Sequence, residues 1–160
     1  MPKPPALTLA AGFAVNAGLR RAIEADPVDP AQMRSYLNLA KSDQVQLDTP
    51  TLSYIADQRM KRAMVELQLS AGSLEVLERA LTLARTLAEL PFETNLWQAQ
   101  NLWQEILRTP MSDLTALAPG DYPQWDASFN ELGEFLSIDY VAMRAQEAAR
   151  LAARSGAAPA

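Results

Sequence analysis

The chain has 160 residues, of which 49% are apolar and 21% charged, with a net charge of −5 and neither cysteine nor histidine. This composition excludes disulfide frameworks, zinc fingers, cysteine and histidine nucleophiles, and haem or metal sites that need histidine ligands. An acidic chain without a basic tract also argues against nucleic acids and anionic membranes as partners. The length suits one domain with a hydrophobic core.

Helix signals recur along the whole chain. Glycine is scarce, and proline or capping residues follow one another at regular intervals. Asp29 before Pro30 and Thr49 before Pro50 indicate two helix starts, and Thr94 is the expected N-cap of a later helix. In chain order, we expect helices over about 6–25, 30–42, 49–69, 73–90, 94–109, 123–136 and 139–154, with a loop over 110–121.

The apolar residues within these segments recur at spacings of three and four, which is the period of amphipathic helices. The fourth segment is apolar on two sides, which predicts that it lies between neighbouring helices. We therefore expect an all-α protein of six or seven helices, stacked as antiparallel helical hairpins in a short α-solenoid or an irregular bundle. Residues 1–154 would form a single helical domain, and residues 155–160 a disordered tail.

An internal repeat supports stacked hairpins. Phe13–Ile23 aligns with Tyr54–Met64 without a gap at a shift of 41 residues, and a further shift of 43 brings Tyr54 onto Trp97. The hairpin-like repeats would cover about 6–110, followed by C-terminal helices over about 122–154. One hairpin cannot bury its apolar faces alone, so neighbouring units must stack. Stacking would bring Arg20–Arg21 and Lys61–Arg62 into a small basic ridge, although such charges are usually just a solvated face.

A second stripe combines aromatic and amide side chains on the side of the helix opposite the core. Aromatic rings beside amide groups are typical of a sugar-binding face, because CH groups stack on the ring and hydroxyls bond to the amides. The alternative is that the aromatic residue of each repeat packs against the next hairpin, whereas Trp103 is expected in the core. The candidate ligand- or partner-binding residues are Phe13, Tyr54, Trp97, Gln100, Asn101 and Gln104.

Three segments carry a resemblance to a known family: residues 13–22, 45–54 and 90–103. Together they resemble the uncharacterised helical domain that lies C-terminal to the catalytic domain of many bacterial family 57 glycoside hydrolases, the α-amylase and α-glucan-transferring type. The sharpest part is the run Asn-Leu-Trp-Gln-Ala-Gln-Asn at 95–101, and the similarity covers about residues 10–110. The catalytic carboxylates of that family sit on a separate barrel domain that no segment here matches. The resemblance therefore implies an accessory module of an α-glucan enzyme and no catalytic residue.

The functional prediction is a non-catalytic accessory domain of an α-glucan-processing system that docks on a catalytic domain and contacts glucan. The alternatives are a helical-repeat protein–protein interaction module with no carbohydrate role, and an enzyme on a helical scaffold. We expect no cofactor, no metal, and neither nucleic acid nor membrane as a partner. No run of 18 apolar residues could span a bilayer. The expected location is cytoplasmic, because without cysteines nothing supports an oxidising compartment. A secretory signal peptide remains the alternative for residues 3–17.

Overall fold

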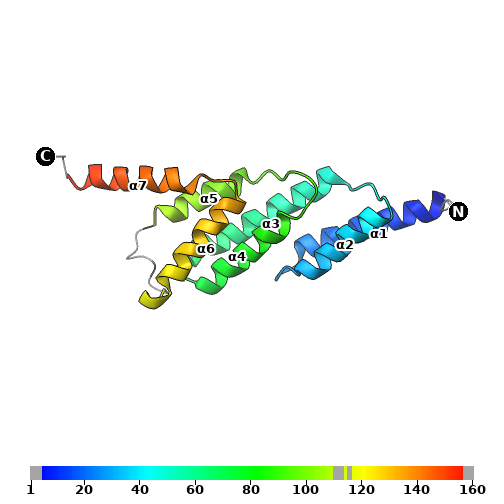
Figure 1. Ribbon diagram of the computed structural model, residues 1–160, viewed down its shortest axis with the longest axis horizontal. Coiled ribbons are helices and arrows are strands. Elements are labelled where there is room, and N and C mark those ends of the chain that lie inside the picture. Colours follow the sequence, from blue (N-terminus) through cyan, green and yellow to red (C-terminus); the bar gives the residue numbers. More distant parts are fainter. Residues whose placement is uncertain (1–4, 110–113, 115–116, 157–160) are drawn as a thin grey trace.

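The computed structural model describes residues 5–109, 114 and 117–156, and these residues contain seven α-helices, one short 3-10 helix and no strand. The predicted all-α class is therefore confirmed. Consecutive helices run antiparallel, and the body is elongated, with the α1–α2 hairpin at one end and α7 at the other (Figure 1). The elements are α1 (Pro5–Glu24), α2 (Pro30–Ser42), α3 (Thr49–Leu69), α4 (Leu74–Leu87), α5 (Trp97–Leu107), η2 (Pro119–Asp121), α6 (Tyr122–Phe135) and α7 (Tyr140–Arg154).

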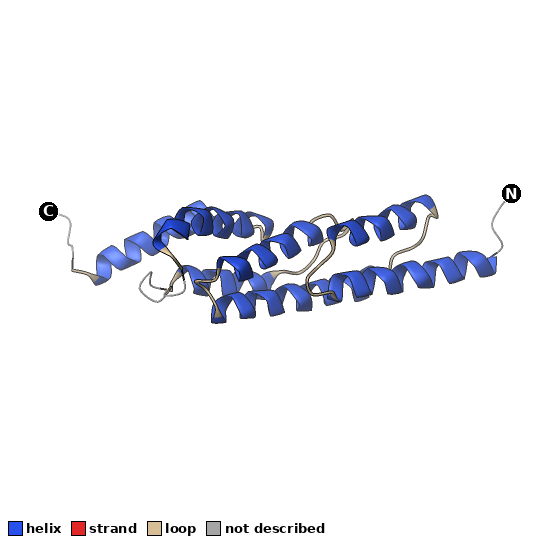
Figure 2. Ribbon diagram, turned by 90° about the horizontal axis from the view of Figure 1, so that it is seen from below, coloured by secondary structure: helices blue, strands red, loops and turns tan. Residues whose placement is uncertain are grey.

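The first six helices form two layers (Figures 1 and 2). Helices α1, α3 and α5 lie in one layer, in which α3 packs on both of its neighbours. On the other side, α2 packs on α1, α4 packs on α3, and α6 packs on α4. Helix α4 thus lies between α3 and α6, as its two apolar sides predict. Helix α7 packs on α6 and extends away from the hairpins.

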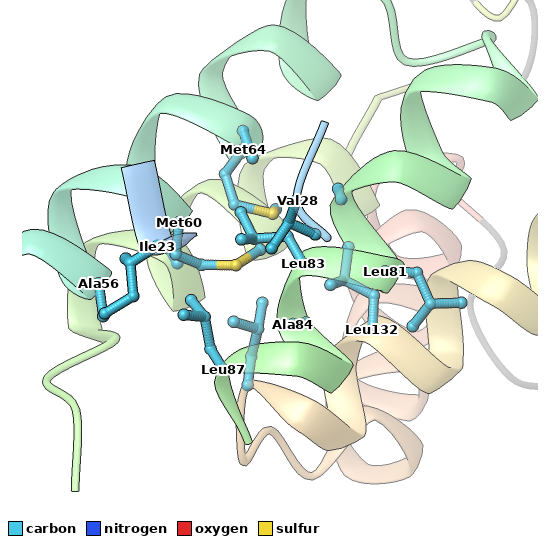
Figure 3. Close-up of a cluster of buried hydrophobic side chains, with 14 of the residues drawn as sticks. Ile23, Val28, Ala56, Met60, Met64, Leu81, Leu83, Ala84, Leu87 and Leu132 are labelled. Carbon is cyan, nitrogen blue, oxygen red and sulfur yellow. The ribbon is translucent and has the colours of Figure 1, made fainter. Parts of the chain in front are cut away.

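The core between the layers follows the helical period. Every residue of the apolar stripe of α3 is buried, because spacings of three and four place them all on one side of the helix. Figure 3 shows Met60 and Met64 of α3 near Leu83 and Leu87 of α4, with Ile23 of α1 beside them. Each such side chain contributes roughly 1.5–3 kcal/mol of transfer free energy when it leaves water. The stripe of α3 consists of Leu52, Ile55, Ala56, Met60, Ala63, Met64 and Leu67.

Stacked aromatic rings fill the core between α5 and α6. The rings of Trp103 and Phe129 lie 4.5 Å apart at 6°, and those of Trp125 and Phe129 lie 4.8 Å apart at 14°. Each buried indole also has a hydrogen-bond acceptor: Trp103 Nε1 donates to the Phe129 carbonyl at 2.9 Å, and Trp125 Nε1 to the Ala71 carbonyl at 2.7 Å. The predicted core position of Trp103 is confirmed.

The starts of α2 and α3 depend on aspartate caps. The carboxylate of Asp29 accepts hydrogen bonds from the second and third residues of α2, as predicted. The cap of α3 is Asp48, whose carboxylate accepts from the Thr51 amide; the prediction of Thr49 as the cap was wrong by one residue. Both side chains satisfy amide groups that the first helical turn leaves without a partner.

The predicted bounds of the fifth helix were also wrong. Its N-cap is Leu96 and not Thr94, and α5 ends at Leu107 and not at Thr109. The side chain of Asn95 accepts a hydrogen bond from the Trp97 amide at 3.2 Å. This local Asx-type contact satisfies an amide of the first turn, so the helix begins at Trp97.

Two further sequence predictions concern segments that are partly described. Of the expected disordered tail, Ser155 is the C-cap of α7, and residues 157–160 lie outside the described residues. Of the expected loop over 110–121, residues 110–113 and 115–116 lie outside them as well. No helix in the described ranges combines the length and apolar character needed to cross a membrane.

Candidate functional site

The three repeat-equivalent aromatic residues are exposed on the outer face of the α1, α3 and α5 layer. The exposed fractions are 79% for Phe13, 65% for Tyr54 and 61% for Trp97, and we call these residues the aromatic row. The alternative that each ring packs against the next hairpin is wrong for this chain, because most of each side chain is in solvent. The rings therefore contribute little apolar burial to the fold.

Contacts between the helices place the three rings near the same end of the layer. Phe13 lines a hollow together with Thr51, which lies one turn before Tyr54 on α3. In the next repeat, the hydroxyl of Ser53 donates to the Glu93 carbonyl at 3.1 Å, four residues before Trp97. The aromatic row thus crosses the layer from α1 through α3 to α5.

The predicted amide set divides into two groups. Gln100 Nε2 donates to the Leu136 carbonyl at 2.8 Å, so this amide connects α5 to the end of α6. Asn101 and Gln104 are half-buried on the face that carries Trp97, and among the described residues their side chains make no hydrogen bond. Of the three predicted amides, two therefore remain beside the ring.

Asn16 occupies in α1 the register that Gln100 occupies in α5, three residues after the aromatic residue. Its Nδ2 donates to the Gln46 carbonyl at 3.1 Å, and its Oδ1 accepts from the Asp48 amide at 2.8 Å. Asn16 thus connects α1 to the segment before α3, and Gln100 connects α5 to the segment before α7. In these two helices, the amide side chain at this position holds neighbouring units together.

A hollow of about 240 Å³ adjoins the aromatic row between α1 and the start of α3. Phe13 and Leu52 provide apolar surface, and Arg20 and Asp48 provide charge. The Asp48 carboxylate already caps α3, and Arg20 Nε lies 3.5 Å from a carboxylate oxygen of Glu24. The hollow is therefore mainly apolar, and its lining carries one cation and one carboxylate, each of which already has a partner. It is lined by Phe13, Asn16, Ala17, Arg20, Asp48, Thr51 and Leu52.

A larger hollow, about 470 Å³, lies on the other layer between α2 and the segment after α4. Arg34 of α2 reaches Glu89 at 2.8 Å along this hollow, and the hydrogen bond and charge of Glu89 raise the pKa of Arg34. The sequence analysis did not identify this hollow. No local pattern indicates that α2 stands apart from α4 while α6 packs on α4.

Within the described ranges, no group of three or more aspartate, glutamate, cysteine or histidine side chains is arranged to hold a metal ion. Comparison with protein-family models, curated proteins and solved structures finds no match for this chain. The aromatic row on the outer face of the α1, α3 and α5 layer is thus the most distinctive surface feature of the described residues.

Proposed function

We propose that the chain is a non-catalytic helical-repeat module that docks on a protein partner through the aromatic row. The observation that carries this proposal is the exposure of a large aromatic side chain at the same register in three adjacent helices. Aromatic residues supply much of the binding energy at protein interfaces, and helical-repeat arrays bind partners along a face built from successive units.

The aromatic row favours a docking face because its side chains are large and yet remain mostly exposed. A folded chain stabilises itself by burying its largest apolar groups, and Phe13, Tyr54 and Trp97 remain 61–79% exposed. Single exposed apolar residues are common on protein surfaces, whereas a group of them marks an interaction site. Three such residues aligned across neighbouring helices fit a docking face.

The resemblance supports a specific partner. The helical domain that the chain resembles accompanies a family 57 glycoside hydrolase catalytic domain, so we propose an α-glucan-processing catalytic domain as the docking partner. The module would then be an accessory domain, and the chemistry would belong to the partner.

Contact with α-glucan is the second candidate. Trp97 is exposed, and Asn101 and Gln104 lie on the same face with amides that make no other hydrogen bond among the described residues. A sugar ring could stack on the indole while its hydroxyls bond to these amides. Because Gln100 already donates a hydrogen bond to Leu136, only two of the three predicted amides remain for a sugar, and glucan contact is therefore the weaker candidate.

The test compares a row variant with a matched control. The row variant is Tyr54→Ser/Trp97→Ser, and the control is Leu39→Ser, which changes an exposed apolar residue of α2 in the other layer. We expect the wild type and the control to bind a purified family 57 catalytic domain in a biolayer interferometry assay, and the row variant to lose at least about tenfold in affinity. Equal binding by all three proteins would contradict docking through the row, and no binding by any of them would contradict this partner.

Glucan contact has its own readout. Tryptophan fluorescence of the wild type is titrated with maltoheptaose and soluble starch, with Trp97→Phe as the control. A saturable change that is absent from the control supports glucan contact, and no change up to millimolar sugar contradicts it.

A further inference from the structure

A third hollow lies beside α7, at the end of α5 that is opposite to Trp97. Its volume is about 370 Å³, and residues of α5, α6 and α7 line it. The lining includes Ile106 of α5 and Trp125 and Phe129 of α6, which are at most 5% exposed. The hollow therefore reaches the aromatic core between α5 and α6.

The rings in the lining belong to one stack of nearly parallel aromatic groups. The Trp125 and Phe129 rings are inclined by 14°, and the Tyr122 ring lies 6.4 Å from Trp125 at 16°. Tyr122 is half-buried and lines the hollow as well. Aromatic groups pack against one another in offset or edge-to-face arrangements, so this wall suits a planar aromatic ligand.

Helix α7 borders the hollow without filling it. No residue of α7 is buried, and Leu151, which lines the hollow, is 56% exposed. Polar contacts connect the helix to α6, because the Arg144 guanidinium donates to the side chains of Asp126 and Asn130 at 2.7 and 2.8 Å. The described residues thus leave a space with apolar walls between α7 and the stacked rings.

The charged groups at the hollow favour an anion. Its lining contains the guanidinium groups of Arg108 and Arg144 and the carboxylate of Glu147. Glu147 Oε1 accepts two hydrogen bonds from Arg150, whereas Glu147 Oε2 lies 3.7 Å from Arg108 Nε, beyond hydrogen-bond distance. The Arg108 side chain therefore makes no hydrogen bond within the described ranges. Even when Arg150 and Asp126 are included, positive groups outnumber negative ones.

The size of the hollow indicates the size of the ligand. An apolar cavity of about 150 Å³ holds one benzene molecule, and small-molecule pockets begin at about 300 Å³. The volume of about 370 Å³ therefore suits two fused rings. A carboxylate attached to these rings would accept hydrogen bonds from the Arg108 guanidinium, which a carboxylate matches in geometry and charge.

We infer that the hollow between α5, α6 and α7 binds a small bicyclic aromatic carboxylate. Its rings lie against Trp125 and Phe129, and its carboxylate lies at Arg108. This site goes beyond the proposed docking function and does not depend on it, because no residue of the aromatic row lines the hollow.

The experiment is isothermal titration calorimetry of the full chain with 2-naphthoate. The charge control is 2-naphthylmethylamine, and the ring control is the saturated decahydronaphthalene-2-carboxylate. Leu151→Trp is designed to fill the hollow, and Leu69→Trp makes the same change at an exposed position of α3. Arg108→Gln removes the cation, and Arg21→Gln makes the same charge change at an exposed position of α1. Thermal unfolding verifies that all variants are folded.

We expect saturable binding of 2-naphthoate with a Kd below about 1 mM. Leu151→Trp should weaken it at least about tenfold, because the indole occupies the space of the ligand, and Arg108→Gln at least about fivefold. The Leu69→Trp and Arg21→Gln controls should stay within about twofold of the wild type, and both control ligands should bind at least about fivefold more weakly.

Each remaining outcome contradicts a defined part of the inference. Unchanged binding by Leu151→Trp would place the ligand outside the hollow and overturn the site. Equal binding of the amine, or an unaffected Arg108→Gln variant, would overturn the preference for an anion. Equal binding of the saturated acid would overturn the preference for aromatic rings. No saturable binding of 2-naphthoate at millimolar concentration would overturn the whole inference, and the assay with the catalytic domain tests the docking function separately.

Discussion

Helices α1, α3 and α5 carry one row of large side chains on their inner face, which is buried, and a second row on their outer face, which is exposed. The inner row, Leu19, Met60 and Trp103, is completely buried, and the aromatic row on the outer face is 61–79% exposed. In each helix the two residues are six positions apart, which turns the side chain by about 240° around the helix axis. The repeat thus keeps both rows in register, one buried in the core and one exposed to solvent.

Within α5 this difference separates two tryptophans. Trp103 stacks on Phe129 and donates a hydrogen bond, whereas Trp97 lies at the first position of the helix with most of its surface in solvent. Residue type therefore does not predict the contribution to stability; the position around the helix does. Four substitutions test this contrast, from the largest expected effect to the smallest.

Trp103→Ala should be the most damaging change. It removes the ring that stacks on Phe129 and leaves the Phe129 carbonyl without its donor. The expected loss is about 3–5 kcal/mol of unfolding free energy, measured by urea denaturation. A loss below about 1 kcal/mol would mean that the inner row does not hold α5 to α6.

Gly18→Ala should come second. A Cβ at this position would collide with the Tyr36 ring of α2, so the α1–α2 hairpin must open or the ring must move. We expect a loss of about 1–3 kcal/mol, seen as a lower midpoint of thermal unfolding. Gly12→Ala is the control, because its Cβ would meet only Val45 Cγ1, at 3.9 Å, and it should stabilise α1 by about 0.5–1 kcal/mol.

Asn16→Ala should have a smaller effect. It removes the two hydrogen bonds that connect α1 to the segment before α3, at partly solvated positions. The expected loss is about 1 kcal/mol in guanidinium denaturation. Asn101→Ala, which breaks no hydrogen bond among the described residues, should be neutral; equal losses in both variants would contradict the structural role of the Asn16 register.

Trp97→Ala should change the stability least. Because the side chain is 61% exposed, we expect less than about 0.5 kcal/mol, measured by differential scanning calorimetry. A loss above about 2 kcal/mol would show that Trp97 is a packing residue and would remove the support for a docking face.

Much of the fold could be predicted from local signals. Six or seven helices were expected and the described residues contain seven, and the stripe of α3 lies in the core as its period predicts. Errors occurred where two capping residues compete within a few positions, at Thr49 against Asp48 and at Thr94 against Asn95. Which side chain accepts the first amide depends on backbone geometry that residue types alone do not specify.

The candidate site could be predicted only in part. The repeat register identified Phe13, Tyr54 and Trp97 as equivalent, but the sequence alone favoured packing against the next hairpin over exposure, and the structure shows the rings exposed. It also grouped Gln100 with Asn101, since the two are adjacent on one helix. The structure separates them, because Gln100 reaches a carbonyl 36 residues further along the chain.

The sequence by itself determined the helices, the inner row and the equivalence of the three aromatic positions. These features follow from the helical period and from proline and capping residues, which act within a few residues. The tertiary structure alone decided that the aromatic row is exposed and that Asn16 and Gln100 connect neighbouring units. Each of these depends on which helix lies next to which, and contacts between distant segments are set by the packing of whole helices.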